Sequence, residues 1–179
     1  MLTKEQIEEA RIRAAQYLDR AGIVVKPEEA ANIEIADFGL GQPEQSGLEI
    51  VVYVNTSRVC AKEIVLFPHQ TCPEHRHPRV EGEPGKEETF RCRWGKVYLC
   101  IPGDPTPNPA AKPPADHEAC YTVWHEIVLN PGDQYTLPPN TLHWFQAGPE
   151  GAILSEFSTK SRDDADVFTD PEIQRVPDR

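Results

Sequence analysis

The chain has 179 residues and a formal net charge of −11, with a sequence pI near 5.0. This length suits a single domain with one substantial hydrophobic core. The acidic balance argues against a nucleic-acid-binding protein, which needs a concentrated basic face, and no apolar run approaches the ~20 residues of a membrane span.

The cellular compartment is predicted from the N-terminus and the cysteines. The first residues, Met-Leu-Thr-Lys-Glu-Gln, lack the basic and apolar stretches of a secretion signal. The cysteines are odd in number and form no Cys-x-x-Cys pair, which is typical of reduced thiols: Cys60, Cys72, Cys92, Cys100 and Cys120. We therefore expect a cytoplasmic protein that binds neither nucleic acid nor membrane.

The N-terminal part of the chain has helical character. Thr3 and Gln6 have the spacing of a capping box, and apolar residues then recur at intervals of three and four. This pattern predicts an amphipathic helix over residues 4–20, and Pro27 predicts a second, short helix with proline in its first turn. We interpret residues 1–45 as a helical extension that covers a barrel or contributes to a dimer.

From residue 48 the sequence changes to short β-rich segments separated by turns, which predicts a sandwich or barrel spanning residues 46–160. The expected strands are 48–54, 61–67, 89–93, 96–101, 122–129, 134–137, 144–147 and 152–158. Residues 102–119 contain six prolines and no apolar period, so they are interpreted as a surface loop that rims the pocket opening. The C-terminal tail, 161–179, is expected either to lie over the barrel mouth or to extend into solvent.

Three histidines and one glutamate have the spacing of a metal site. The two-residue period of a strand puts His75 and His77 on one face, so their rings can hold one ion together. Glu88 begins a segment that we interpret as a hairpin turning at Gly95. His143 follows a Pro-Pro-Asn turn that fixes its direction. The pattern therefore predicts a divalent-metal site.

The segment with His75, His77 and Glu88 and the segment that ends at His143 resemble the paired motifs of the cupin superfamily. Cupins are small all-β proteins with an antiparallel barrel of the double-stranded β-helix, jelly-roll-like type. The resemblance implies four metal ligands: His75, His77, Glu88 and His143. The ten-residue gap between His77 and Glu88 is longer than is usual in cupins, which leaves other carboxylates as alternatives: Glu81, Glu83 and Glu87. Glu88 is preferred because its spacing to Gly95 fits the motif and because the insert has the Gly/Pro composition of a loop.

Longer phrases are more specific, among them Thr-Cys-Pro-Glu-His-Arg-His-Pro and Pro-Pro-Asn-Thr-Leu-His-Trp-Phe-Gln-Ala-Gly. They resemble the D-lyxose isomerase family, and the likeness extends over nearly the whole chain. It implies a homodimeric sugar isomerase with a manganese-type ion, for which Co²⁺, Fe²⁺, Zn²⁺ or Ni²⁺ are alternatives. The implied reaction converts D-lyxose to D-xylulose, or D-mannose to D-fructose.

Isomerisation needs an ion that chelates O1 and O2 of an open-chain sugar and an acid–base pair that moves a proton between C2 and C1. Strand alternation requires either Lys62 or Glu63 to face inward, and the resemblance favours Lys62, as an acid or an orienting donor whose pKa is lowered toward neutrality. Glu156 is the expected base, with three carboxylates as replacements: Glu63, Asp163 and Asp166. The sequence does not choose between proton transfer and a hydride shift.

Three other functions are compatible with a cupin site: a dioxygenase, a phosphosugar isomerase and a non-catalytic sugar-binding stress protein. A dioxygenase pocket should be apolar, and a phosphosugar isomerase needs cations near the site. Five basic residues do surround the first motif: Arg76, Arg79, Lys86, Arg91 and Arg93. Glutamates are interleaved among them, which favours a solvated charged rim. Cys72, three residues before His75, is interpreted as a packed thiol.

Overall fold

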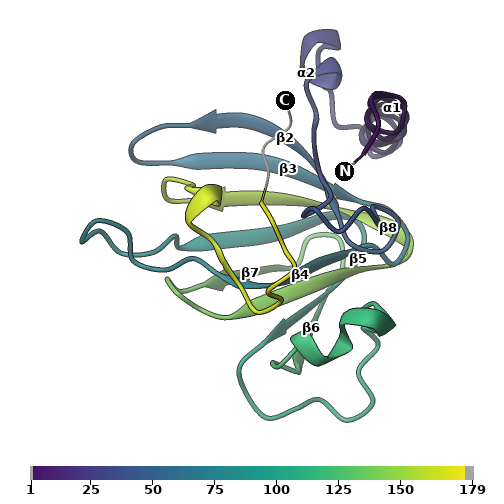
Figure 1. Cartoon of the computed structure of the whole chain (residues 1–179). Helices are drawn as coiled ribbons and strands as arrows, with labels where there is room; N and C mark the ends of the chain where they lie inside the picture. Colours follow the sequence, from purple (N-terminus) through teal and green to yellow (C-terminus); the bar gives the residue numbers. More distant parts are fainter. Residues whose placement is uncertain (1, 176–179) are drawn as a thin grey trace.

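The computed structural model describes residues 2–175 (Figure 1). Residue 1 of the expected domain and residues 176–179 of its expected tail lie outside this range. The helices are α1 (Lys4–Arg20) and α2 (Pro27–Ala31), with 3-10 turns η1 (Ala115–Cys120) and η2 (Asp163–Ala165). The strands are β1 (Glu34–Ala36), β2 (Leu48–Asn55), β3 (Cys60–Leu66), β4 (Thr71–Arg76), β5 (Glu88–Ile101), β6 (His125–Leu129), β7 (Gln134–Leu137), β8 (His143–Ser158) and β9 (Val167–Phe168).

Helix α1 begins at the predicted capping box. Thr3 Oγ1 accepts from Gln6 N at 3.2 Å, and Gln6 Oε1 accepts from Thr3 N at 2.9 Å, so two otherwise unpaired donors are satisfied. Its apolar face, including Leu18, packs with Phe67 and Ile153 on the outer side of the sheet. The helix therefore covers the barrel from outside, as predicted (Figure 1).

Two long strands organise the barrel. Strands β5 and β8 pair antiparallel along most of their length, from Glu88↔Ser158 to Cys100↔Trp144. The C-terminal half of β8 also pairs with β3, and its N-terminal half pairs with β4. Strands β5 and β8 thus run through both halves of a curved antiparallel sheet, which confirms the predicted all-β fold with N-terminal helices.

Glycines allow the two long strands to bend where they cross from one half to the other. Gly95 has φ +71°, and a Cβ there would lie 2.1 Å from Gly151 O. Gly151 has φ +88°, and a Cβ there would lie 2.7 Å from Leu66 O. The predicted hairpin turn at Gly95 is therefore wrong: the strand continues through a bulge, because its partner β8 bends with it.

Other differences are local. The prediction split both β5 and β8 into two strands and gave no bounds for the strand that carries His75, which is β4. It expected no strand at β1 or β9, and β6 is shorter than expected. The loop over residues 102–119 does not rim the pocket. It packs elsewhere, where Ala111 is buried and Lys112 N donates to Gln146 Oε1 at 2.8 Å.

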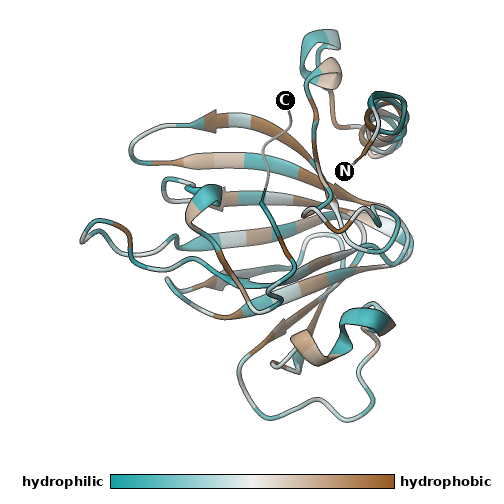
Figure 2. Cartoon of the chain, viewed as in Figure 1, coloured by the Kyte–Doolittle hydropathy of each residue, from teal (hydrophilic) through white to brown (hydrophobic). Residues whose placement is uncertain are grey.

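The barrel interior is apolar over most of its length, from Leu99 and Leu129 to Leu66 and Leu154. Figure 2 shows hydrophobic residues alternating with hydrophilic ones along the strands, as expected for walls with an inner and an outer face. The C-terminal segment, yellow in Figure 1, crosses the sheet near β4. No helix within residues 2–175 has both the length and the apolar character needed to cross a bilayer.

Candidate metal centre

The four predicted metal-ligand residues meet at one end of the barrel. His75 lies near the end of β4 and His77 just beyond it, while Glu88 and His143 are the first residues of β5 and β8. His75 lies directly opposite His143 in the β4–β8 pairing. All four side chains are buried. The strand ends therefore aim three imidazoles and one carboxylate at a common point.

Hydrogen bonds fix the tautomers of two imidazoles. His75 Nδ1 lies 2.8 Å from Pro73 O, and His143 Nδ1 lies 2.9 Å from Thr141 O. Because a carbonyl oxygen only accepts, each Nδ1 carries the proton and each Nε2 keeps a free lone pair. One nitrogen from each of the three histidines lies within 4.8 Å of the others. Three nitrogens this close together could hold a metal ion.

Glu88 completes the donor set. Its Oε1 lies 3.0 Å from His77 Nε2 and 3.1 Å from His143 Nε2. The His143 contact lacks hydrogen-bond geometry, so His143 Nε2 is a buried polar atom without a hydrogen-bond partner in the described residues. A cation among these atoms would satisfy that nitrogen. The alternative glutamates are exposed and do not join the cluster: Glu81, Glu83 and Glu87.

The protonation states also suit a cation. Burial lowers the pKa of His75 well below its usual value, and the other two histidines lower it further, so this ring is neutral. Burial opposes ionisation of Glu88, but Lys86 and His77 outweigh it and hold the pKa of the carboxyl well below its usual value. For His77, Glu88 and Asp166 outweigh burial and raise the pKa to about 9. A metal ligand must be deprotonated, so the proton between His77 and Glu88 is the one that a cation would replace.

Lys86 is a site residue that the sequence analysis missed. It was assigned to a solvated rim, but it is buried, and its Nζ lies 2.7 Å from Glu88 Oε2 and 3.1 Å from Glu156 Oε1. Burial opposes its charge, yet these carboxylates raise the pKa of Lys86 well above its usual value. Its position two residues before Glu88 was the available signal, since that spacing puts both side chains on one side of an extended chain.

Lys62 and Glu156 both face the interior. They are opposite each other in the β3–β8 pairing, are buried, and line one cavity together with His75 and Glu88. Glu63 points to the other side of the sheet, where its carboxylate accepts from Ser155 Oγ at 2.6 Å. The inward orientation predicted for Lys62 is therefore correct, and Glu63 is not available as a base in this cavity.

The charge state predicted for Lys62 is wrong. Burial lowers the pKa of Lys62, as anticipated, but the Glu156 and Asp163 carboxylates outweigh it and raise the pKa above its usual value. Lys62 Nζ donates to Asp163 Oδ2 at 2.9 Å and to Ser161 Oγ at 3.1 Å. Asp163 belongs to the C-terminal tail, whose path no local sequence pattern reveals.

The interior cavity has a volume of about 40 Å³, which exceeds the ~10–15 Å³ that a cavity needs to hold one water. A larger open pocket of about 440 Å³ adjoins it. Three residues line both: His77, Lys86 and Asp166. Cys72 also lines the interior cavity, and burial raises the pKa of its thiol well above the usual value, which suits a packed thiol.

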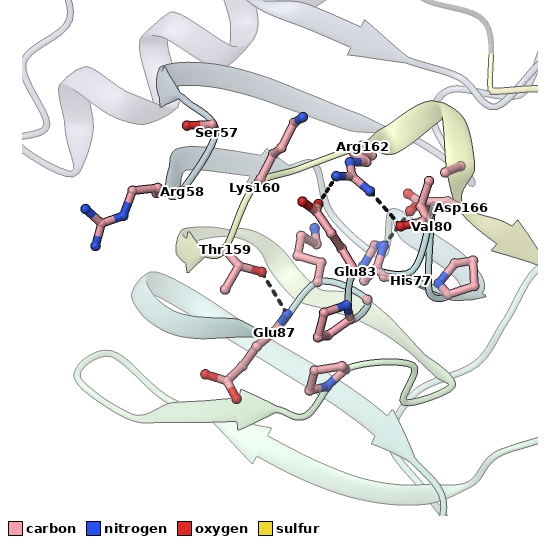
Figure 3. A pocket seen from close by; sticks show the side chains of 16 residues that line it. Ser57, Arg58, His77, Val80, Glu83, Glu87, Thr159, Lys160, Arg162 and Asp166 are labelled. Carbon is pink, nitrogen blue, oxygen red and sulfur yellow. Dashed lines mark hydrogen bonds and ion pairs between the residues drawn. The ribbon is translucent and has the colours of Figure 1, made fainter.

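Two segments meet over the open pocket (Figure 3). Arg162 of the tail forms an ion pair with Glu83 of the insert and donates to Val80 O at 3.3 Å. Glu87 N donates to Thr159 Oγ1 at 3.2 Å. The long gap between His77 and Glu88 therefore forms one wall of the mouth, and the tail forms the other.

Comparisons with known proteins give close relatives, although no family model matches the sequence. The chain is 62% identical over 178 residues to a D-lyxose/D-mannose isomerase of Thermosediminibacter oceani, covering 99% of this chain and 98% of that protein. It is 61% identical over 178 residues to a D-lyxose ketol-isomerase of a Thermofilum species, covering 99% of each. A D-lyxose ketol-isomerase of Cohnella laeviribosi is 60% identical, with 94% and 93% covered.

Solved structures share the fold at low sequence identity. The L-ribose isomerase of Acinetobacter sp. DL28, in complex with L-ribose, superposes with a TM-score of 0.81 at 16% identity, covering 96% of this chain and 94% of that one. The L-ribose isomerase of Cellulomonas parahominis, with L-ribose, gives a TM-score of 0.80 at 19% identity and the same coverage.

The curved antiparallel barrel and the histidine cluster at its end define a cupin-type protein with a site that could bind a metal ion. The predicted fold class is thereby confirmed. Over nearly its full length the chain matches curated relatives at 60% identity or more. The chain belongs to the D-lyxose ketol-isomerase family and is a sugar isomerase.

Proposed function

We propose that the chain is a metal-dependent aldose–ketose isomerase that acts on a free monosaccharide, with D-lyxose and D-xylulose as the preferred pair and D-mannose and D-fructose as a second pair. The observation that carries this proposal is the placement of an inward carboxylate, Glu156, beside a cluster of three imidazoles and Glu88. The names of the close relatives support the choice of sugars.

In this proposal the metal ligands are His75, His77, Glu88 and His143, and the ion is Mn²⁺. Neutral imidazoles and a carboxylate suit several divalent transition metals, so the donor set supports a metal of this class more strongly than any one ion. A divalent ion bound there would polarise the substrate carbonyl and stabilise the negative charge that develops when a proton leaves carbon.

The residues of the chain would move the proton. Glu156 accepts the proton from C2 of the open-chain aldose and delivers it to C1, while a proton passes from O2 to O1, so that aldose and ketose differ only in the positions of two hydrogens. Lys62, opposite Glu156 on β3, orients a sugar oxygen or donates to it. Lys86 Nζ lies 3.1 Å from Glu156 Oε1 and helps to hold this carboxylate in place.

Two observations favour a free sugar over the other substrates. Three charged groups face the cavity: Lys62, Lys86 and Glu156. They suit a polyol better than the flat apolar substrate of a dioxygenase. At the mouth, Arg162 is paired with Glu83, which leaves it less available to a phosphate.

The experiment is an assay of metal-free protein reloaded with Mn²⁺, in which ketose is measured from D-lyxose, from D-mannose and from their phosphorylated counterparts. We expect D-xylulose to form fastest and chelation to abolish its formation. The proposal fails if metal-loaded protein produces no ketose from any free aldose, or if only the phosphorylated sugars react.

We further propose that the protein is a homodimer. The outer face of the sheet carries an apolar row across neighbouring strands, Val54↔Ala61 and Ala61↔Phe157, in which Phe157 is 51% exposed. Next to this row the buried Glu63 Oε2 has no hydrogen-bond partner in the described residues. A second copy over this face would cover the apolar row and could supply a donor to that oxygen.

A further inference from the structure

The C-terminal segment of residues 159–175, here called the strap, crosses the barrel at the histidine cluster. Its strand β9 pairs with β4 through His75↔Phe168 and Arg76↔Val167. The Phe168 ring stacks on the His75 ring, with centroids 5.4 Å apart and an interplanar angle of 29°. The strap therefore contacts one of the proposed metal ligands directly and does more than cover the surface of the barrel.

The three histidines differ in what holds them. His75 and His143 donate from Nδ1 to carbonyls two residues away on their own segments. The Nδ1 of His77 instead lies 2.5 Å from Asp166 Oδ1, 89 positions along the chain in the strap. A carboxylate on Nδ1 directs Nε2 toward the proposed ion and increases the basicity of the ring. Only for His77, among these three, does that support come from a distant segment.

The strap is anchored next to this contact. Thr169 N donates to Glu74 O at 3.0 Å, and Thr169 Oγ1 donates to Glu74 Oε1 at 2.7 Å. The same carboxylate accepts from Thr122 N at 2.6 Å and from Val123 N at 3.0 Å, so Glu74 is itself fixed. Glu74 precedes His75 on β4. The anchor therefore sets the position of the strap relative to the strand that carries the first histidine.

We propose that Asp166 is a positioning residue for His77, and that the Thr169–Glu74 anchor sets metal affinity by holding Asp166 in place. This inference rests on the metal site of the proposed function. It adds that metal retention depends on docking of the strap. Among the contacts described above, Thr169 touches none of the four proposed ligands, so its effect would be transmitted through Asp166. Loss of Asp166 and loss of the Thr169–Glu74 anchor should each change the Kd for the metal, independently of the rate of turnover.

The test measures the Kd for Mn²⁺ by competition with a chelating dye, well below the thermal midpoint of each protein. Asp166→Ala should weaken binding ~10- to 100-fold, the range found for partners of metal-bound histidines, and Asp166→Asn should lose less because its amide oxygen still accepts from Nδ1. Thr169→Val should weaken binding several-fold. The matched control is Thr136→Val, which removes an exposed Thr–Thr hydrogen bond on β7 and should leave the Kd unchanged.

A double-mutant cycle separates the proposed coupling from general loosening. If Thr169 acts through Asp166, then Thr169→Val has no further effect on the Kd in the Asp166→Ala background. Multiplication of the two single effects, or an unchanged Kd in Asp166→Ala, overturns the inference. If Asp166→Ala does not fold, the same cycle with Asp166→Asn decides it.

The two proposals fail in different ways. Wild-type protein that binds no Mn²⁺ overturns both the proposed metal site and this inference. Wild-type protein that binds Mn²⁺ but produces no ketose overturns the proposed reaction alone, and the affinities of the variants still decide the role of Asp166.

Discussion

At the scale of single residues, the carboxylate of Glu156 is held by short contacts with its neighbours. Its Oε1 accepts from Lys86 Nζ at 3.1 Å and from Ser158 Oγ at 2.9 Å, and Lys62 lies opposite on β3. These contacts fix the position of the carboxylate, and a general base must be held within reach of the proton that it accepts. The same donors would hold a neutral amide in nearly the same place.

Glu156→Gln should therefore keep the fold and the metal but lower kcat by ~10²- to 10⁴-fold, the usual contribution of a general base. The measurements are kcat for D-lyxose and bound metal by mass spectrometry, with the exposed Glu118→Gln as the control. Turnover close to that of wild type would move the role of base to Asp163 or Asp166. Solvent deuterium in the product of a single turnover would favour proton transfer over a hydride shift.

Glu49 gives a prediction about stability and pH. It is fully buried on β2, its Oε1 accepts from Gln70 Nε2 at 2.9 Å, and its Oε2 has no hydrogen-bond partner in the described residues. Burial raises the pKa of Glu49 to about 8, and the hydrogen bond from Gln70 only partly opposes this. The unfolded chain ionises this group near its ordinary pKa, so between about pH 4.5 and 8 the folded state binds more protons and stability falls as pH rises.

Glu49→Gln should remove this penalty. Relative to wild type, we expect little change in the free energy of unfolding at pH 4.5 and a gain on the order of 4 kcal/mol at pH 8. Urea unfolding at several pH values measures it, and the exposed Glu118→Gln is the control. A difference between Glu49→Gln and wild type that stays constant with pH would contradict the assignment.

At the scale of elements, the bend in β5 depends on the absence of a side chain at residue 95. A Cβ at Gly95 would lie 2.1 Å from Gly151 O, a backbone atom of the partner strand that cannot move without unbending β8. Gly132 also has positive φ, +95°, but a Cβ there would meet nothing within 4 Å. Substitution of either glycine has the cost of a positive φ, but only substitution of Gly95 adds a steric clash. A comparison of the two variants therefore measures the cost of the clash.

Gly95→Ala should lower the free energy of unfolding by at least ~3 kcal/mol, and Gly132→Ala by only ~1 kcal/mol. Chemical denaturation of both variants measures the difference. Equal effects would mean that β8 relaxes freely around Gly95, and the bend would then not depend on that glycine.

The same glycine marks the limit of what the sequence predicted. A glycine inside an apolar strand pattern is compatible with a turn or a bulge, and only the partner strand decides between them. The convergence of His75, His77, Glu88 and His143 could be predicted, because strand alternation is local and the motif spacing resembles that of cupins. Strand alternation required either Lys62 or Glu63 to face inward, and the resemblance to the isomerase family then favoured Lys62.

The contributions from the insert and from the tail could not be predicted in the same way. Lys86 lies in an insert without periodicity, and its burial depends on Glu88 and Glu156. Asp166 reaches His77 only because the strap crosses β4. These positions depend on long-range packing, which a pattern along one segment does not contain.

At the scale of the whole molecule, the proposed site is assembled from β3, β4, β5, β8 and the strap, so an ion there would bind the folded chain and not the unfolded one. Ligands that bind only the native state stabilise it by about 2.7 kcal/mol at 100 times Kd. For a chain of this length, that corresponds to roughly 5–10 °C in Tm.

Removal of divalent metal with a chelator should therefore lower Tm by roughly 5–10 °C, and added Mn²⁺ should restore it. Differential scanning calorimetry at fixed pH measures the change. His143→Ala is the matched variant, and its Tm should not respond to Mn²⁺. A wild-type Tm that is the same with chelator and with Mn²⁺ would mean that no ion stabilises the native state.

The outer face of the sheet gives the last prediction. Phe157 projects from β8 on the side opposite Glu156, and its cross-strand neighbours Ala61 and Thr89 continue the surface onto β3 and β5. Phe157→Arg would place a charge at the centre of the proposed dimer contact, whereas Val128→Arg replaces an exposed apolar residue on β6, away from it. Light scattering should give twice the 20.1 kDa chain mass for wild type and Val128→Arg, and a single chain mass for Phe157→Arg. A wild-type monomer excludes the dimer, and a dimeric Phe157→Arg places the contact on another surface.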